Sequence, residues 1–445
     1  MLKLAFLARS VLFSIPDLHH KDLTTVLNFQ NFTPYRRELD NGFVLTSIAN
    51  PEDIERLVEF NGTSFGPGEA TMTRALITHH PSSRPDYWLI LKDQDRIIAS
   101  VVLIPWAWRY EETVLKCGEM GIVSTAAAYR NRGLMRVLDA RFKELLHKDG
   151  FHISPIQGIP YFYRQFDYEY ALPLEAQWRI ELWQIPAPAD AAITFRKATV
   201  EDIPMLQQLH AVASQRQNIS TIRSAEIWRY LLEHSPGTGT EADTWLLERN
   251  QQIIAYCRIH KEGFGDGLIV SEASRLDHQT SDSLLAWLKS VAIERGKPYI
   301  RFNLPVMSDL LTLARAYGAV DGGGYQWQIH VVDPARLLRQ IGPVLERRLV
   351  GSPFATLTQS VVINLYRNAV ALSFEQGQLR SVEALNRPTD SPINLPPNLL
   401  APLVLGFRSR SELAEGYPDA RIYGSACALI DTLFPPMQAF LDTIY

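Results

Sequence analysis

Three arginines surround one glycine at the point where a predicted strand gives way to a predicted helix. The arginines are Arg130, Arg132 and Arg136, and the glycine is Gly133. Unpaired backbone N–H groups at a helix start attract anions, and glycine lets a phosphate approach the backbone closely. Arginine adds charge-assisted hydrogen bonds to phosphate oxygens. The spacing predicts a pyrophosphate-binding turn, although a solvated basic turn would have the same composition.

Two neighbouring elements must hold this turn in place. A strand is predicted to begin at Val114–Cys117 and to continue through Gly121–Thr125. A helix over Leu134–Lys148 follows the turn, because its apolar residues recur at helical spacing. Cys117 precedes the turn by several residues, so we interpret it as a core residue and not as a nucleophile.

An aromatic cluster follows the next predicted strand, Phe151–Ile156. A tyrosine has a pKa near 10, so its hydroxyl stays protonated at neutral pH and can donate a proton. Aromatic side chains are more often packing residues than catalysts. The cluster therefore holds either a proton donor or only core side chains, among Tyr161, Phe162, Tyr163, Phe166, Tyr168 and Tyr170.

The strand, the Tyr129-Arg130 loop and the Arg130-x-x-Gly133 turn together resemble the coenzyme A-binding motif of the GNAT acetyltransferase superfamily. This resemblance implies acetyl-CoA as a cosubstrate. Met135 departs from the motif, because most members carry glycine or alanine at that place. The cofactor-binding residues implied by the resemblance are Ile122, Val123, Ser124, Arg130, Asn131, Arg132, Gly133, Leu134 and Met135.

The pattern over Gly158–Tyr168 is similar to the enhanced intracellular survival (Eis) type of this superfamily. That resemblance makes Tyr163 the general acid that protonates the departing thiolate. It makes the terminal carboxylate of Tyr445 the base that accepts the amine proton. The backbone N–H of Val123 would polarise the thioester carbonyl. The amine then attacks directly, without a covalent enzyme intermediate.

Tyr445 has a competing interpretation, because the last residues of a chain are commonly frayed and solvated. The apolar run Met437–Ile444 argues against fraying, and Asp442 adds an acidic group close by. A docked and a frayed terminus both stay open at this point.

An internal repeat organises the first two thirds of the chain. Ala49–Leu57 recurs as Ala198–Leu206, and the strand pairs that follow, joined by the polar turns Lys92–Arg96 and Arg249–Gln252, stay in step. The repeat predicts two domains of one fold. The proline- and alanine-rich segment at residues 185–192 is predicted to be a linker, since few contacts should cross it.

The fold class predicted is α/β (α+β), with two GNAT-like mixed-sheet domains followed by a smaller sterol-carrier-like α+β domain. The domain boundaries predicted are an extension at 1–35, a catalytic domain at 36–185, a degenerate second domain at 193–335 and the third domain at 336–445. The second domain is predicted to have lost its CoA site, because the corresponding loop, Ser274–Asp282, lacks Arg-x-x-Gly and carries two aspartates that would repel phosphate. This second domain is predicted to form one wall of the substrate cleft.

Composition limits the partners. The formal charge of −4 gives no support for a nucleic-acid partner, and three scattered cysteines fit a reducing compartment. The two His-His pairs lack the spacing of a metal site. The apolar N-terminal start resembles a signal sequence, but Arg9 interrupts it. We therefore predict a cytoplasmic protein with no metal, no nucleic-acid partner and no membrane partner.

The function expected is an acetyl-CoA-dependent N-acetyltransferase acting on a primary amine, such as an aminoglycoside, a polyamine or a lysine-like substrate. The resemblance further implies a homo-oligomer, a hexamer. The alternatives are a tandem-GNAT enzyme with another acyl donor, or a non-catalytic lipid- or amine-binding protein with a relict CoA site.

Overall fold

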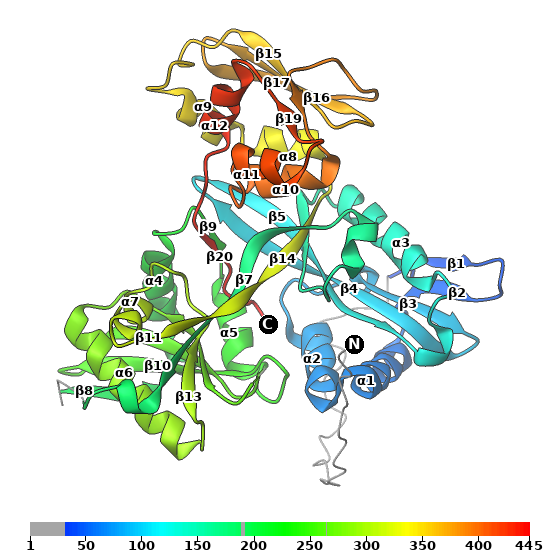
Figure 1. Cartoon of the computed structure of the whole chain (residues 1–445). Helices are drawn as coiled ribbons and strands as arrows, with labels where there is room; N and C mark the ends of the chain where they lie inside the picture. Colours follow the sequence, from blue (N-terminus) through cyan, green and yellow to red (C-terminus); the bar gives the residue numbers. More distant parts are fainter. Residues whose placement is uncertain (1–31, 188–191, 264) are drawn as a thin grey trace.

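The computed structural model describes residues 32–187, 192–263 and 265–445 (Figure 1). Within these residues the strands form one 15-stranded sheet and one 5-stranded sheet, flanked by helices. The mixed α/β architecture predicted from sequence is confirmed. Residues 1–31 of the predicted extension and residues 188–191 of the predicted linker lie outside the described residues.

The first lobe places two helices on one side of its strands and one helix on the other (Figure 1). The first helix begins at Pro51, and the Asn50 side chain caps it by accepting from the Asp53 N–H at 2.8 Å. The elements are β1 (Arg36–Glu38), β2 (Val44–Ser47), α1 (Pro51–Phe65), α2 (Pro67–His79), β3 (Trp88–Asp93), β4 (Arg96–Tyr110), β5 (Thr113–Thr125), α3 (Leu134–Lys148) and β6 (Ile153–Ile156).

The second lobe repeats the order strand, two helices, three strands, helix and strand, with a short extra strand between its first two helices. The sequence also predicts a strand over Ile193–Lys197, and this strand and the two hairpins with turns at Lys92–Arg96 and Arg249–Gln252 are confirmed. The long strand β7 (Glu169–Glu181) leads into this lobe, whose elements are β8 (Ile193–Lys197), α4 (Ile203–Ser214), β9 (Ile219–Thr221), α5 (Ala225–Glu233), β10 (Ala242–Arg249), β11 (Gln252–His260), β12 (Leu268–Ala273), α6 (His278–Glu294), β13 (Tyr299–Phe302), α7 (Asp309–Ala316) and β14 (Val320–Val331).

Two long strands join the lobes into one sheet. β7 pairs with β13 of the second lobe, with Ile180 opposite Ile300. β14 pairs with β7 and also with β6 of the first lobe, where Gln328 lies opposite Ile156. The last strand of the second lobe therefore completes the sheet of the first.

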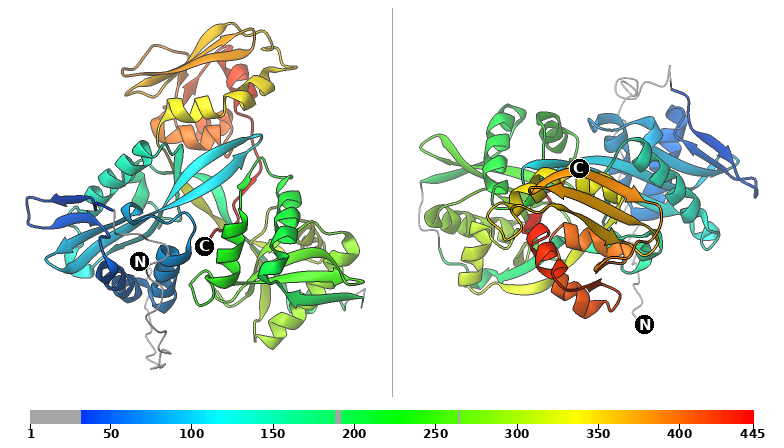
Figure 2. Two further views of the ribbon diagram at one scale, coloured as in Figure 1. Left: turned by 180° about the vertical axis from the view of Figure 1, so that it is seen from behind. Right: turned by 90° about the horizontal axis from the view of Figure 1, so that it is seen from above.

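The third lobe caps the other two at one end (Figures 1 and 2). The sequence predicts one helix over 336–350 and then strands at 360–366, 369–374 and 379–383. The strands are confirmed as β15 to β17, but the helix is two helices, the second of which begins at Gly342 with Pro343, which has no N–H to donate, in its first turn. The elements are α8 (Pro334–Gln340), α9 (Gly342–Leu349), β15 (Gln359–Asn364), β16 (Ala369–Glu375), β17 (Gln378–Leu385), β18 (Ile393–Asn394), α10 (Leu400–Val404), α11 (Arg410–Gly416), β19 (Arg421–Ile422) and α12 (Ala426–Leu433).

After the third lobe the chain returns between the first two lobes, where it ends (Figure 1). The short strand β20 (Ala439–Phe440) pairs in parallel with β9, and Ala439 lies opposite Ile219. The side chains of Leu441, Ile444 and Tyr445 are buried. This tail, residues 437–445, is docked and not frayed.

Candidate active site

A β-bulge interrupts the pairing of β4 with β5. Ser100 lies opposite Ser124 and Val102 opposite Gly121, so Ile122 and Val123 together face one residue of β4. Ile122 has a φ of 42°, an uncommon conformation for a β-branched residue. Such bulges re-aim backbone groups and concentrate at functional sites. Ser124 is held beside the bulge by a 2.7 Å hydrogen bond to the Ser64 hydroxyl.

A cavity of about 250 Å³ opens where β5 and β6 separate. The strands pair at Cys117 and Ile153, and the Ser154 hydroxyl donates to the Gly118 carbonyl at 2.7 Å. Beyond this point both strands line the cavity. Residues that line it include Glu119, Ile122, Val123, Gln157, Tyr163 and Tyr445. Four residues predicted from sequence, Ile122, Val123, Tyr163 and Tyr445, thus share one pocket.

Tyr163 lies in a short 3₁₀ turn at one wall of this cavity and is 7% exposed. Burial raises the pKa of its phenol well above the usual value, so the hydroxyl keeps its proton. Gly158 leaves room for the ring, because a Cβ there would lie 2.3 Å from the Tyr163 Cδ2. Residues of β14 fix this loop: Tyr325 and Gln328 donate to the Gly158 carbonyl at 2.6 and 3.0 Å.

The same cavity is lined by a buried carboxyl group that was not among the residues predicted from sequence. Glu119, on β5, accepts from the Tyr445 hydroxyl at 2.7 Å and from the Trp106 indole N–H at 2.8 Å. Gln157 donates to the same Tyr445 hydroxyl at 3.0 Å. The available signal was a lone acidic residue within a predicted strand, but its main partner lies at the other end of the chain.

Burial raises the pKa of Glu119 to about 8, although its hydrogen bonds oppose the shift. Between its ordinary value of 4.5 and this value, the folded protein holds a proton that the unfolded chain has lost. The stability contributed by this group therefore falls as pH rises through that window.

We expect the Glu119→Gln variant to lose this pH dependence. Relative to the variant, the wild-type free energy of unfolding should decline by about 1 kcal/mol per pH unit between pH 5 and 8, and then level off. Urea unfolding of both proteins at several pH values measures the difference. A constant difference across this range would contradict the assigned shift.

The predicted pyrophosphate-binding turn is exposed and open. Gly133 has a left-handed φ of 75° and directly precedes α3, which has no side-chain cap from any described residue. Arg130 and Asn131 are exposed, while Arg132 packs over the Tyr129 ring at 5.0 Å. Leu134 is buried and Met135 packs against the core beneath α3. The first-turn N–H groups and the exposed arginines fit an anionic ligand.

The corresponding helix of the second lobe begins differently. Asp277 precedes α6, and its carboxylate accepts from the Thr280 N–H at 2.6 Å. Its own acidic side chain thus occupies the place that an anion takes at an open helix start. This arrangement disfavours a phosphate at α6.

Residues 47–171 match the family model described as an acetyltransferase (GNAT) domain. This part of the chain is therefore similar to GNAT acetyltransferase domains. The match includes the bulge, the Gly133 turn and Tyr163. A search of curated protein sequences finds no match to this chain.

Solved structures share the fold of nearly the whole chain. A GCN5-related N-acetyltransferase from Anabaena variabilis is 15% identical, with a TM-score of 0.67 over 90% of this chain and 99% of that chain. A probable N-acyltransferase from Enterococcus faecalis is 13% identical, with a TM-score of 0.68 over 93% and 100%. Eis1 from Mycobacterium abscessus is 14% identical, with a TM-score of 0.61 over 90% and 100%. The GNAT domain and these neighbours support an N-acyltransferase.

Within the described part of the chain, no helix is long and apolar enough to cross a bilayer. The same residues contain no group of three or more side chains placed to bind a metal ion.

Proposed function

We propose that the chain is an acetyl-CoA-dependent N-acetyltransferase that transfers the acetyl group to a primary amine. The observation that carries this proposal is the single cavity where the bulged strand meets a protonated phenol and a buried carboxyl group, in a GNAT domain with an open helix start. Acetyl-CoA would supply the activated acetyl group. Aminoglycosides, polyamines and lysine-like amines remain the acceptor classes proposed.

Each residue has a distinct task in this proposal. The first turn of α3, with Arg130 and Gly133, holds the pyrophosphate. The Val123 N–H beside the bulge donates to the carbonyl that the amine attacks. Tyr163 delivers its proton to the leaving sulfur, and the carboxylate that Tyr445 would carry as the last residue accepts the proton of the amine.

We propose the same domain boundaries that the sequence predicts, with an extension at 1–35 and domains at 36–185, 193–335 and 336–445. The second lobe is a GNAT-like domain that has lost its cofactor site and forms a wall of the cleft, which Thr240 supports because it lines the cavity. The third lobe is a sterol-carrier-like domain. We also propose a cytoplasmic location and a homo-oligomer, a hexamer by resemblance to Eis proteins.

Thiol release from acetyl-CoA tests the reaction. The purified chain is incubated with acetyl-CoA and a panel of aminoglycosides, polyamines and lysine peptides, and CoA binding is measured by calorimetry. Amine-dependent release is the expected result. Absence of both release and CoA binding would instead favour the binding-protein alternative with a relict cofactor site.

The turn at Gly133 allows a sharper test of cofactor binding. Asparagine and aspartate both tolerate the left-handed conformation of this position, but only aspartate adds a negative charge. Gly133→Asp would imitate the Asp277 cap of α6 and repel phosphate.

We expect Gly133→Asp to weaken CoA binding by about 10-fold or more, the size of a lost charge-assisted contact. Gly133→Asn is the matched control and should bind CoA within about 3-fold of wild type, a difference of less than 1 kcal/mol. Calorimetry with CoA alone measures both. Equal affinities of the two variants would show that the α3 start does not face the pyrophosphate.

A further inference from the structure

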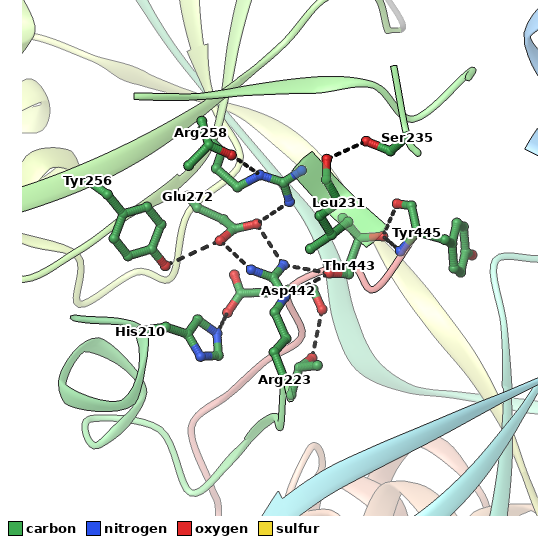
Figure 3. Close-up of polar contacts among 12 residues, drawn as sticks. His210, Arg223, Leu231, Ser235, Tyr256, Arg258, Glu272, Asp442, Thr443 and Tyr445 are labelled. Carbon is green, nitrogen blue, oxygen red and sulfur yellow. Dashed lines mark hydrogen bonds and ion pairs between the residues drawn. The ribbon is translucent and has the colours of Figure 1, made fainter. Parts of the chain in front are cut away.

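A buried ion cluster lies in the second lobe, next to the tail (Figure 3). Arg223, just before α5, binds both carboxylate oxygens of Glu272 at 2.8 and 2.7 Å. Arg258 of β11 binds the same carboxylate at 2.9 Å. Both arginine side chains have no exposed surface, and that of Glu272 is 3% exposed.

Arg223 also binds the tail, whereas Arg258 makes no hydrogen bond to it among the described residues. The Arg223 Nε donates to the Thr443 carbonyl at 2.9 Å, and its Nη2 donates to the same oxygen (Figure 3). Asp442 is held on both sides, because its carbonyl accepts from the Thr221 hydroxyl at 2.8 Å and its carboxylate lies 3.0 Å from the His210 Nε2.

The charge balance of the cluster explains why the tail docks there. Two guanidinium groups face one carboxylate, so the buried cluster carries an excess positive charge. Buried charges are costly unless every donor has an acceptor. The Thr443 carbonyl supplies the acceptor that Arg223 still lacks, and the nearby Asp442 carboxylate adds negative charge. Desolvation lowers the pKa of Arg223, but the charges of Glu272 and Asp442 outweigh this effect and raise it.

Two residues beyond this anchor, Tyr445 lies in the cavity of the first lobe. Its hydroxyl bonds to Glu119, and its ring meets that of Trp106 edge to face at 6.1 Å. No bond of the Arg223 cluster itself reaches that cavity among the described residues. We infer that Arg223 is a positioning residue, which holds Thr443 so that Tyr445 and Glu119 lie in register with the bulge and with Tyr163.

This inference rests on the proposed function, because Arg223 would position groups for the proposed acetyl transfer. It assigns a task to the second lobe, which keeps the scaffold of a GNAT domain but closes its own helix start with Asp277. The lobe would act on the reaction through the tail and not through a cofactor.

Arg258 provides the matched control. Arg223→Met and Arg258→Met each remove one buried arginine from Glu272, but only the first releases Thr443. We expect Arg223→Met to lower kcat about 100-fold, as for a reacting group displaced by an ångström, with the KM for acetyl-CoA within a few-fold of wild type. Arg258→Met should keep kcat within a few-fold, although its melting temperature falls comparably.

Hydrogen exchange of residues 438–445 gives a readout that does not depend on turnover. Exchange in this segment should rise in Arg223→Met and stay near wild type in Arg258→Met. Thr221→Val removes one tail bond at nearly constant volume, so it should show a smaller rise even if the arginine variants fold poorly.

Two results would overturn the inference: equal kcat losses in the two arginine variants, or tail exchange that Arg223→Met leaves unchanged. If wild-type protein releases no thiol with any amine, the proposed function fails. The exchange measurement then still decides whether Arg223 holds the tail.

Discussion

Replacing Tyr163 by phenylalanine should lower kcat for amine acetylation by about 100-fold or more, because the departing thiolate loses its proton donor. The ring would keep its place between Gly158 and Phe166, since only the hydroxyl is removed. Burial keeps the pKa of this phenol well above its usual value, so the donor remains protonated through the assay range. Steady-state thiol release with saturating acetyl-CoA measures the effect.

Tyr161→Phe is the matched control for this variant. It makes the same chemical change two residues earlier, on a ring that is 76% exposed. Its kcat should stay near wild type, and CoA should bind both variants with wild-type affinity. A Tyr163→Phe enzyme with undiminished kcat would remove Tyr163 from the proposed mechanism.

Adding a glycine after Tyr445 should lower kcat to a similar extent, because the carboxylate proposed as base moves away from the amine by one residue. General-base catalysis is typically worth 10² to 10⁴ in rate. The Tyr445 ring can stay bound to Glu119 and Trp106 in the extended chain, so stability should change little. The same thiol-release assay, with thermal unfolding beside it, measures both quantities.

The Tyr445→Phe variant distinguishes the role of the Tyr445 side chain from that of its main-chain carboxylate. It removes the hydroxyl that donates to Glu119 but leaves the terminal carboxylate, so kcat should remain within a few-fold of wild type. If the extended chain is fully active and Glu119→Gln is inactive, Glu119 is the base and Tyr445 merely orients it.

Local periodicity was sufficient to predict the helix that follows the pyrophosphate-binding turn. The helix Leu134–Lys148 has the predicted bounds, because its apolar positions and the glycine before it are all local signals. The bulge, in contrast, could not be predicted from local signals. A strand was predicted through Gly121–Thr125, but the left-handed conformation of Ile122 within it depends on how β4 and β5 pair.

Long-range pairing could not be predicted in the same way. β14 begins with Val320 and soon enters Gly322–Gly324, a run more typical of a turn than of a strand. Its place between β6 and β7 is set by residues far away in the chain. The Glu119–Tyr445 bond and the Arg223–Thr443 bond join segments that lie still farther apart in the chain, so no local pattern could predict them.

The position of β14 has a consequence for how the chain folds. A fragment of residues 36–185 would leave β6 without its partner from residues 320–331, and a bare strand edge favours aggregation. The catalytic cavity also needs Thr240 and Tyr445. Such contacts raise the mean sequence separation of native pairs, and high contact order slows folding. During synthesis, the first lobe would therefore wait with an incomplete sheet until the second lobe has emerged from the ribosome.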